Sequence, residues 1–132
     1  MKILLVEDEY IVAASLKFLL ATMGYEVVGV ADDVASTITE AERTRPELAF
    51  VDIQLAKGDS GLDAAAELQK RGVICIFLTC NSPSGPRPDL AIGCLPKPFS
   101  DVGLEGAIKI AEAYIKKLPL PNSPPDFELY LL

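Results

Sequence analysis

Polar and charged side chains stand at the ends of four short apolar stretches of the chain. They comprise a pair of carboxylates, a third carboxylate, a hydroxyl and an amine, which are Glu7 with Asp8, then Asp52, Thr79 and Lys97. Apolar stretches of this length are typical of parallel strands that are buried on both faces. The carboxyl ends of such strands meet at one edge of an open α/β sheet, where ligands bind. We therefore expect the five side chains to form one site with the groups needed for phosphoryl transfer.

Each of these residue types has a defined part in such chemistry. A carboxylate such as Asp52 can attack phosphorus and form an acyl phosphate. Glu7 and Asp8 offer the hard oxygen ligands that Mg²⁺ prefers, and a divalent cation would relieve the repulsion between converging carboxylates. Lys97 would contact Asp52 and the phosphoryl oxygens as a positive charge, and Thr79 would donate a hydrogen bond to the same group. Taken singly, each could instead be structural, as a helix cap, a helix-dipole partner, a solvated lysine or a strand former.

These residues can meet only if strands and helices alternate along the chain. Apolar stretches predict strands over residues 2–6, 26–31, 48–52 and 73–78, with a fifth strand near Cys94. Helical spacing and helix-ending residues predict helices over residues 9–22, 33–44, 61–70 and 102–117. The predicted fold class is α/β: a flavodoxin-like, doubly wound, five-stranded parallel sheet with strand order 2-1-3-4-5. Residues 1–118 form this domain and residues 119–132 a proline-rich tail with an apolar end.

The connection between Thr79 and Lys97 departs from this alternation. Its prolines and its glycine exclude a helix over the first two-thirds of the connection: Pro83, Gly85, Pro86 and Pro88. Only residues 89–92 could form a turn. The fourth helix of the fold is therefore predicted to be short or missing.

With these motifs in place, the chain resembles the receiver domain of two-component response regulators over residues 1–118. The resemblance is carried by residues 3–9 (ILLVEDE), 50–55 (FVDIQL) continuing to Gly58 and Ser60-Gly61, 77–79 (FLT) and 96–100 (PKPFS). It implies a stand-alone regulator that accepts a phosphoryl group on Asp52 from a histidine kinase or a histidine phosphotransfer protein. On this resemblance the domain catalyses only its own phosphorylation and dephosphorylation, and it signals to an unidentified downstream protein.

The resemblance also assigns a ligand set. Asp8 would bind Mg²⁺ or Mn²⁺ directly, Glu7 directly or through water, and Asp52 and the backbone carbonyl of Gln54 would complete the protein ligands. It implies a cis bond between Lys97 and Pro98. The shortened fourth helix is similar to receivers that partner HWE-type histidine kinases.

One position differs from the family pattern. Receivers usually carry Tyr or Phe three residues before the lysine, and this chain has Cys94 there. We therefore expect the signal to leave through residues 80–93. Gln54 and Asn81 are expected to flank the access route to the site. Cys75, Cys80 and Cys94 are interpreted as small buried hydrophobes, with a redox role for Cys80 as the alternative.

The composition excludes several classes of protein. With 12 basic and 19 acidic residues the formal charge is −7, which argues against binding nucleic acid through a basic face. No apolar segment reaches the roughly 18 residues of a membrane span, and we expect a cytoplasmic protein. The chain has no histidine, so a phosphohistidine donor must be another protein.

Two questions stay open from the sequence alone. The apolar end of the tail could pack on its own domain, add as an edge strand to another subunit in a homodimer, dock a partner, or be disordered. The alternative function is a phosphate-independent protein-binding module on a receiver scaffold. A haloacid dehalogenase-type hydrolase is disfavoured, because Gln54 stands where that family needs a second carboxylate.

Overall fold

The computed structural model describes residues 1–55, 58–79 and 85–130, with the backbone alone for Thr79. A single mixed sheet runs through the molecule in the order β2-β1-β3-β4-β5-β6. Its strands are β1 (Lys2–Val6), β2 (Glu26–Ala31), β3 (Leu48–Val51), β4 (Ile74–Thr79), β5 (Gly93–Pro96) and β6 (Glu128–Leu129). The first five are parallel, which confirms the predicted order 2-1-3-4-5, and β6 pairs antiparallel with β5.

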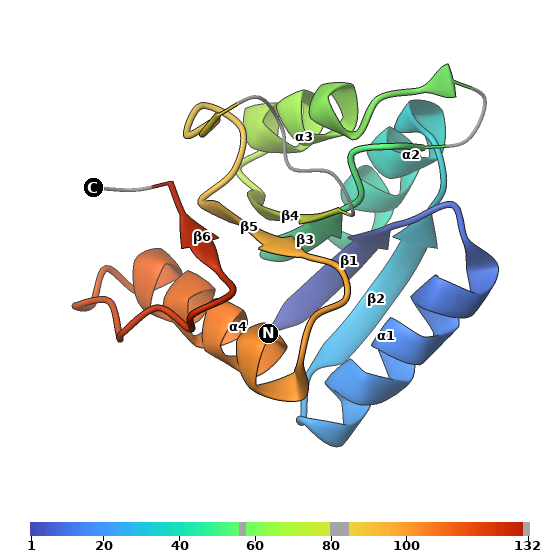
Figure 1. The fold of residues 1–132 in the computed structure, drawn as a ribbon. Helices are drawn as coiled ribbons and strands as arrows, with labels where there is room; N and C mark the ends of the chain where they lie inside the picture. Colours follow the sequence, from blue (N-terminus) through green and yellow to red (C-terminus); the bar gives the residue numbers. More distant parts are fainter. Residues whose placement is uncertain (56–57, 80–84, 131–132) are drawn as a thin grey trace.

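In the described part of the chain, four helices cover the two faces of the sheet (Figure 1). They are α1 (Tyr10–Thr22), α2 (Val34–Thr44), α3 (Gly61–Lys70) and α4 (Asp101–Ile115). Helices α2 and α3 pack on one face, where Leu4 and Val6 point, and α1 with α4 on the other, where Ile3 and Leu5 point. The alternation along β1 places every second side chain in each core, because successive strand residues point to opposite faces. No helix among the described residues combines the length and apolar character needed to span a membrane.

Serine side chains cap the N-termini of α3, which follows β3, and of α4, which follows β5. The Ser60 hydroxyl accepts a hydrogen bond from the Leu62 amide at 3.1 Å, which caps α3. The Ser100 hydroxyl accepts one from the Gly103 amide at 2.9 Å, which caps α4. Both caps satisfy amide groups that have no partner within the helix, and they set where the chain turns away from the sheet edge.

The described part of the β4–β5 connection, residues 85–92, contains no helix. It has a single turn, in which the amides of Leu90 and Ala91 donate to the Arg87 carbonyl at 3.0 and 3.1 Å. Leu90 and Ala91 are buried in the same core as α2 and α3. The prediction of a short or missing fourth helix is confirmed for these residues, where a largely exposed turn buries only its last two residues, Leu90 and Ala91.

The five predicted parallel strands are confirmed, and the described residues add one short antiparallel strand that the sequence did not predict. Residues of the tail return to the sheet as β6, and Phe127 and Tyr130 on either side of it are buried. The tail therefore packs on its own domain, which is one of the four alternatives left open by the sequence. A two-residue strand shows no alternation of apolar and polar residues, and the prolines before it are typical of an unstructured tail.

Candidate functional site

The ends of β1 and β3 bring three carboxylates together. The Asp52 amide donates to the Val6 carbonyl at 2.9 Å and the Glu7 amide to the Ala31 carbonyl at 2.8 Å, so the chain after each strand is tied to its neighbour. One carboxylate oxygen from each of Glu7, Asp8 and Asp52 lies within 4.8 Å of the others. The structure thus brings together the acidic residues that the sequence placed at one sheet edge.

These carboxylates differ in their access to water. Glu7 is 5% exposed and Asp52 8%, whereas Asp8 is exposed. Burial raises the pKa of Glu7 to about 7, and the neighbouring Asp52 adds to this against the opposing effect of Lys97. The Glu7 Oε1 atom is buried and has no hydrogen-bond partner among the described residues. A buried carboxylate oxygen without a partner is costly, and a cation would satisfy it.

Lys97 lies between the two buried carboxylates. Its Nζ atom is 3.1 Å from Glu7 Oε2 and 3.2 Å from Asp52 Oδ2. The residue follows β5 directly and precedes Pro98 through a cis peptide bond, as the resemblance implied. Burial by itself lowers the pKa of Lys97, but the hydrogen bonds and charges of Glu7 and Asp52 outweigh it and raise the pKa. The amine is therefore a fixed positive charge at the centre of the site.

The backbone after Asp52 is held by a glycine whose importance the sequence did not reveal. The Gly61 amide donates to the Ile53 carbonyl at 2.6 Å, and a Cβ atom at Gly61 would collide with the Asp52 carbonyl. The Gln54 amide donates to Asp52 Oδ1 at 3.1 Å, which orients the carboxylate. Gly61 belongs to the quoted Ser60-Gly61 motif, but its close contact with Asp52 is a tertiary feature that chain spacing cannot show.

The remaining predicted residues are placed only in part. The Thr79 backbone ends β4 and pairs with Pro96, next to Lys97, and its side chain lies outside the described atoms. Cys80 and Asn81 also lie outside the described residues. Gln54 is exposed beside Asp52, and its expected place on the access route stays a prediction. Cys75 and Cys94 are buried, as interpreted from the sequence, and burial raises the pKa of the Cys75 thiol to about 12.

The donor set fits a divalent cation. Three carboxylates supply hard oxygen ligands of the kind that Mg²⁺ takes in combination with water and phosphate oxygens. The unpartnered Glu7 Oε1 points to the same requirement from the protein side. Residues Glu7, Asp8 and Asp52 would hold the ion.

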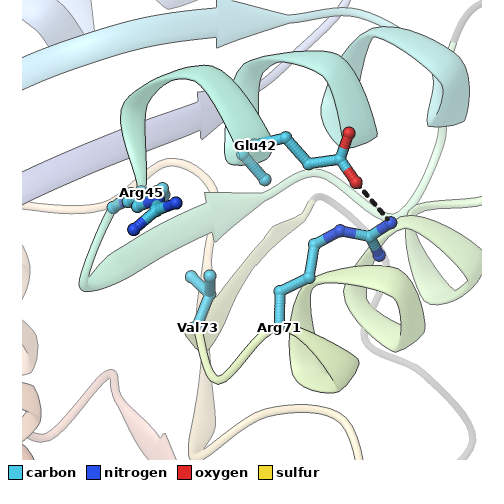
Figure 2. Close-up of a pocket in the computed structure, with 6 residues that line it drawn as sticks. Glu42, Arg45, Arg71 and Val73 are labelled. Atoms are coloured by element: carbon cyan, nitrogen blue, oxygen red, sulfur yellow. Dashed lines mark hydrogen bonds and ion pairs between the residues drawn. The ribbon is translucent and has the colours of Figure 1, made fainter.

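A separate cavity lies at the opposite edge of the sheet (Figure 2). It has a volume of about 440 Å³ and is lined by residues that precede β3 and β4, among them Arg45, Arg71 and Val73. Its charged lining is largely self-paired, because Arg71 contacts Glu42 and Glu67 at 3.1 Å each. None of the five predicted site residues is among those that line this cavity.

Comparison with known proteins matches residues 3–109 to the model of the response regulator receiver domain. The chain is 38% identical over 115 residues to the phyllosphere-induced regulator PhyR of Methylorubrum extorquens, covering 83% of the chain and 43% of the relative. It is 33% identical over 122 residues to the transcriptional regulatory protein PdtaR of Mycobacterium tuberculosis, covering 89% of the chain and 59% of the relative. It thus spans about half the length of these curated relatives.

A solved structure shows the same fold. The receiver domain of PhyR from Erythrobacter litoralis superposes with a TM-score of 0.75 at 26% identity, covering 93% of this chain and 95% of that one. The family match spans most of the chain and contains the strand ends that carry the acidic cluster and Lys97. On the strength of this match, the chain belongs to the response regulator receiver domain family.

Proposed function

We propose that Asp52 accepts a phosphoryl group in a Mg²⁺- or Mn²⁺-dependent reaction and that the phosphorylated chain signals through contacts with another protein. The observation that carries this proposal is the position of Lys97, whose amine contacts Glu7 and Asp52 at the centre of a buried acidic site. A lysine so placed can transfer its hydrogen bonds to phosphoryl oxygens without moving far.

We take the natural donor to be a phosphohistidine, which this sequence cannot supply because it contains no histidine. An Asp52 oxygen forms the new bond to phosphorus while the bond from phosphorus to the donor imidazole breaks, and the imidazole keeps the electron pair. A cation held by Glu7, Asp8 and Asp52, with the Gln54 carbonyl as a further ligand, would neutralise charge on the transferring group. Thr79 at the end of β4 would donate to the transferred group. The donor protein fits the class of histidine kinases or histidine phosphotransfer proteins, and the HWE type is the narrower candidate.

The residues around Asp52 have separate tasks in this reaction. The Gln54 amide holds Asp52 Oδ1 at 3.1 Å, so the carboxylate is oriented before the donor arrives. Lys97 donates hydrogen bonds to Glu7 Oε2 and Asp52 Oδ2 and offsets the charge of both carboxylates. Preorganised charges of this kind lower the cost of bringing a phosphoryl group to an acidic site.

The test is the intact mass of the chain after incubation with acetyl phosphate and Mg²⁺. We expect one labile phosphoryl adduct in the wild type, and no adduct in Asp52→Asn or in samples with a chelator. Asp52→Asn keeps the shape of the side chain, so loss of the adduct reports loss of the acceptor rather than of the fold. An adduct that persists in Asp52→Asn would place the acceptor elsewhere. No adduct with acetyl phosphate or with a phosphorylated donor protein would favour the phosphate-independent binding module.

A further inference from the structure

Residues 124–130, termed here the C-terminal strap, lie in a slot that the rest of the chain leaves open for them. The strap is anchored by two aromatic side chains, Phe127 and Tyr130, each only 5% exposed. Three glycines on β5 and α4 face it, and a Cβ atom at any of them would collide with a strap residue: Gly93 with Phe127, Gly103 with Asp126 and Gly106 with Pro124. The slot is therefore formed by missing side chains on two different elements.

The backbone of the strap is held by few hydrogen bonds. The Tyr130 amide donates to the Ile92 carbonyl at 2.8 Å, and only Glu128 and Leu129 pair with β5. The segment before the strap, residues 116–123, is exposed at every position. A segment with two side-chain anchors and a two-residue ladder is among the parts of a fold that open most easily.

Tyr130 connects the strap to β4 and β5, two of the four strands that lead into the site. Its ring centroid lies 6.5 Å from that of Phe77 on β4, and its hydroxyl lies beside the Cys94 thiol on β5. The hydroxyl has no nitrogen or oxygen as a hydrogen-bond partner among the described residues. Its polar neighbour is the Cys94 thiol, which is a weak acceptor. Phe77 stands two residues before Thr79, and Cys94 three residues before Lys97.

Strand β5 connects the strap to the site. It has four residues, Gly93–Pro96, and all four pair with β4. Strand β5 thus pairs over its full length with β4 on one side and over two residues with β6 on the other. Lys97 directly follows β5 and is bound to Glu7 and Asp52. A change in the pairing of Lys97 would pull on β5, and the strap is the weaker of the two contacts along that strand.

We propose that docking of the C-terminal strap is coupled through β5 and Tyr130 to occupancy of Asp52. The proposal rests on the proposed function, because the event that changes the pairing of Lys97 is the arrival of a phosphoryl group. The strap is docked when Lys97 is shared between Glu7 and Asp52, and it loosens when Lys97 turns to phosphoryl oxygens. Coupling between two such equilibria is reciprocal. If a phosphoryl mimic at Asp52 favours release of the strap by some factor, a chain without a docked strap must bind the mimic more tightly by the same factor.

The test uses beryllium fluoride with Mg²⁺, a phosphoryl mimic that does not turn over, and the amide of Tyr130 as the probe. We expect exchange of the Tyr130 amide hydrogen with solvent to become about ten-fold faster when the mimic binds, within the usual range of coupling between sites. Tyr130→Ala should then bind the mimic about ten-fold more tightly than the wild type, and Tyr130→Phe, which keeps the ring, should bind like the wild type. Gly106→Ala displaces the strap from the α4 side and should act like Tyr130→Ala without touching the ring.

Separate readouts distinguish the two proposals. The amide signals of Asp52 and Lys97 report binding at the site, and the Tyr130 amide reports the strap. Shifts at Asp52 and Lys97 with an unchanged Tyr130 exchange rate would overturn the strap proposal alone. No response at either place would contradict both proposals. Equal affinity of the wild type, Tyr130→Ala and Gly106→Ala for the mimic would also overturn the coupling.

Discussion

Glu7 is the residue whose ionisation the site controls most strongly. Its pKa is raised to about 7, chiefly by burial, whereas the unfolded chain has an ordinary value of 4.5. Between these two pH values the folded chain holds a proton that the unfolded chain has released. In the absence of a divalent ion, the free energy of unfolding should therefore fall as pH rises from about 4.5 to about 7, by on the order of 3 kcal/mol.

Denaturant unfolding of the wild type and Glu7→Gln in chelator, at intervals between pH 4.5 and 8, checks this prediction. Glu7→Gln keeps the size of the side chain and cannot ionise, so its stability should lack this fall. The difference between the two chains isolates Glu7 from the other titrating groups. Parallel curves for the two chains across this range would contradict the prediction.

At the scale of elements, the turn from β3 to α3 depends on the absence of a side chain at Gly61. Alanine there would push on the Asp52 carbonyl. We expect Gly61→Ala to lower the free energy of unfolding by about 1–3 kcal/mol, as overpacking in a tight core does, and to weaken Mg²⁺ binding because Asp52 is displaced.

The matched control is Asp63→Ala, an exposed change in the first turn of the same helix. Its effect should stay within about 1 kcal/mol, the size of a helix-dipole contribution, and its Mg²⁺ affinity should equal that of the wild type. Chemical denaturation and Mg²⁺ titration of both variants give the answer. If both variants retain wild-type Mg²⁺ affinity, Gly61 does not position Asp52.

The elements also show what sequence reasoning can and cannot reach. Glu7, Asp52 and Lys97 could be placed together because each follows a buried parallel strand, and all such strands end at the same edge. Strand β6 and its anchors could not, since two residues carry no periodicity. Gly93 and Gly106 make room for the strap across long chain separations, which only the folded structure reveals.

At the scale of the whole molecule, the net charge of −7 and the converging carboxylates favour the binding of cations to the folded chain. A cation that binds only the folded state stabilises it by mass action, by about 2.7 kcal/mol at a concentration one hundred times its dissociation constant. We expect the melting temperature to rise with Mg²⁺ concentration in the wild type. Asp8→Ala removes an exposed ligand with little packing, so its melting temperature without Mg²⁺ should match the wild type and its response to Mg²⁺ should be much smaller. Equal responses of the two chains would exclude Asp8 from the cation site.

The two outer strands of the sheet have a consequence for self-association. An exposed strand edge is a template for pairing with other chains and thus for aggregation. On one side, β6 covers part of the β5 edge and is itself only two residues long. On the other side, the pairing of β1 with β2 skips Val28, and the Arg43 guanidinium donates to the Val28 carbonyl at 3.3 Å. A bulge on one outer strand and a very short strand at the other leave little straight backbone for a second sheet to extend, which disfavours edge-to-edge aggregation of folded chains.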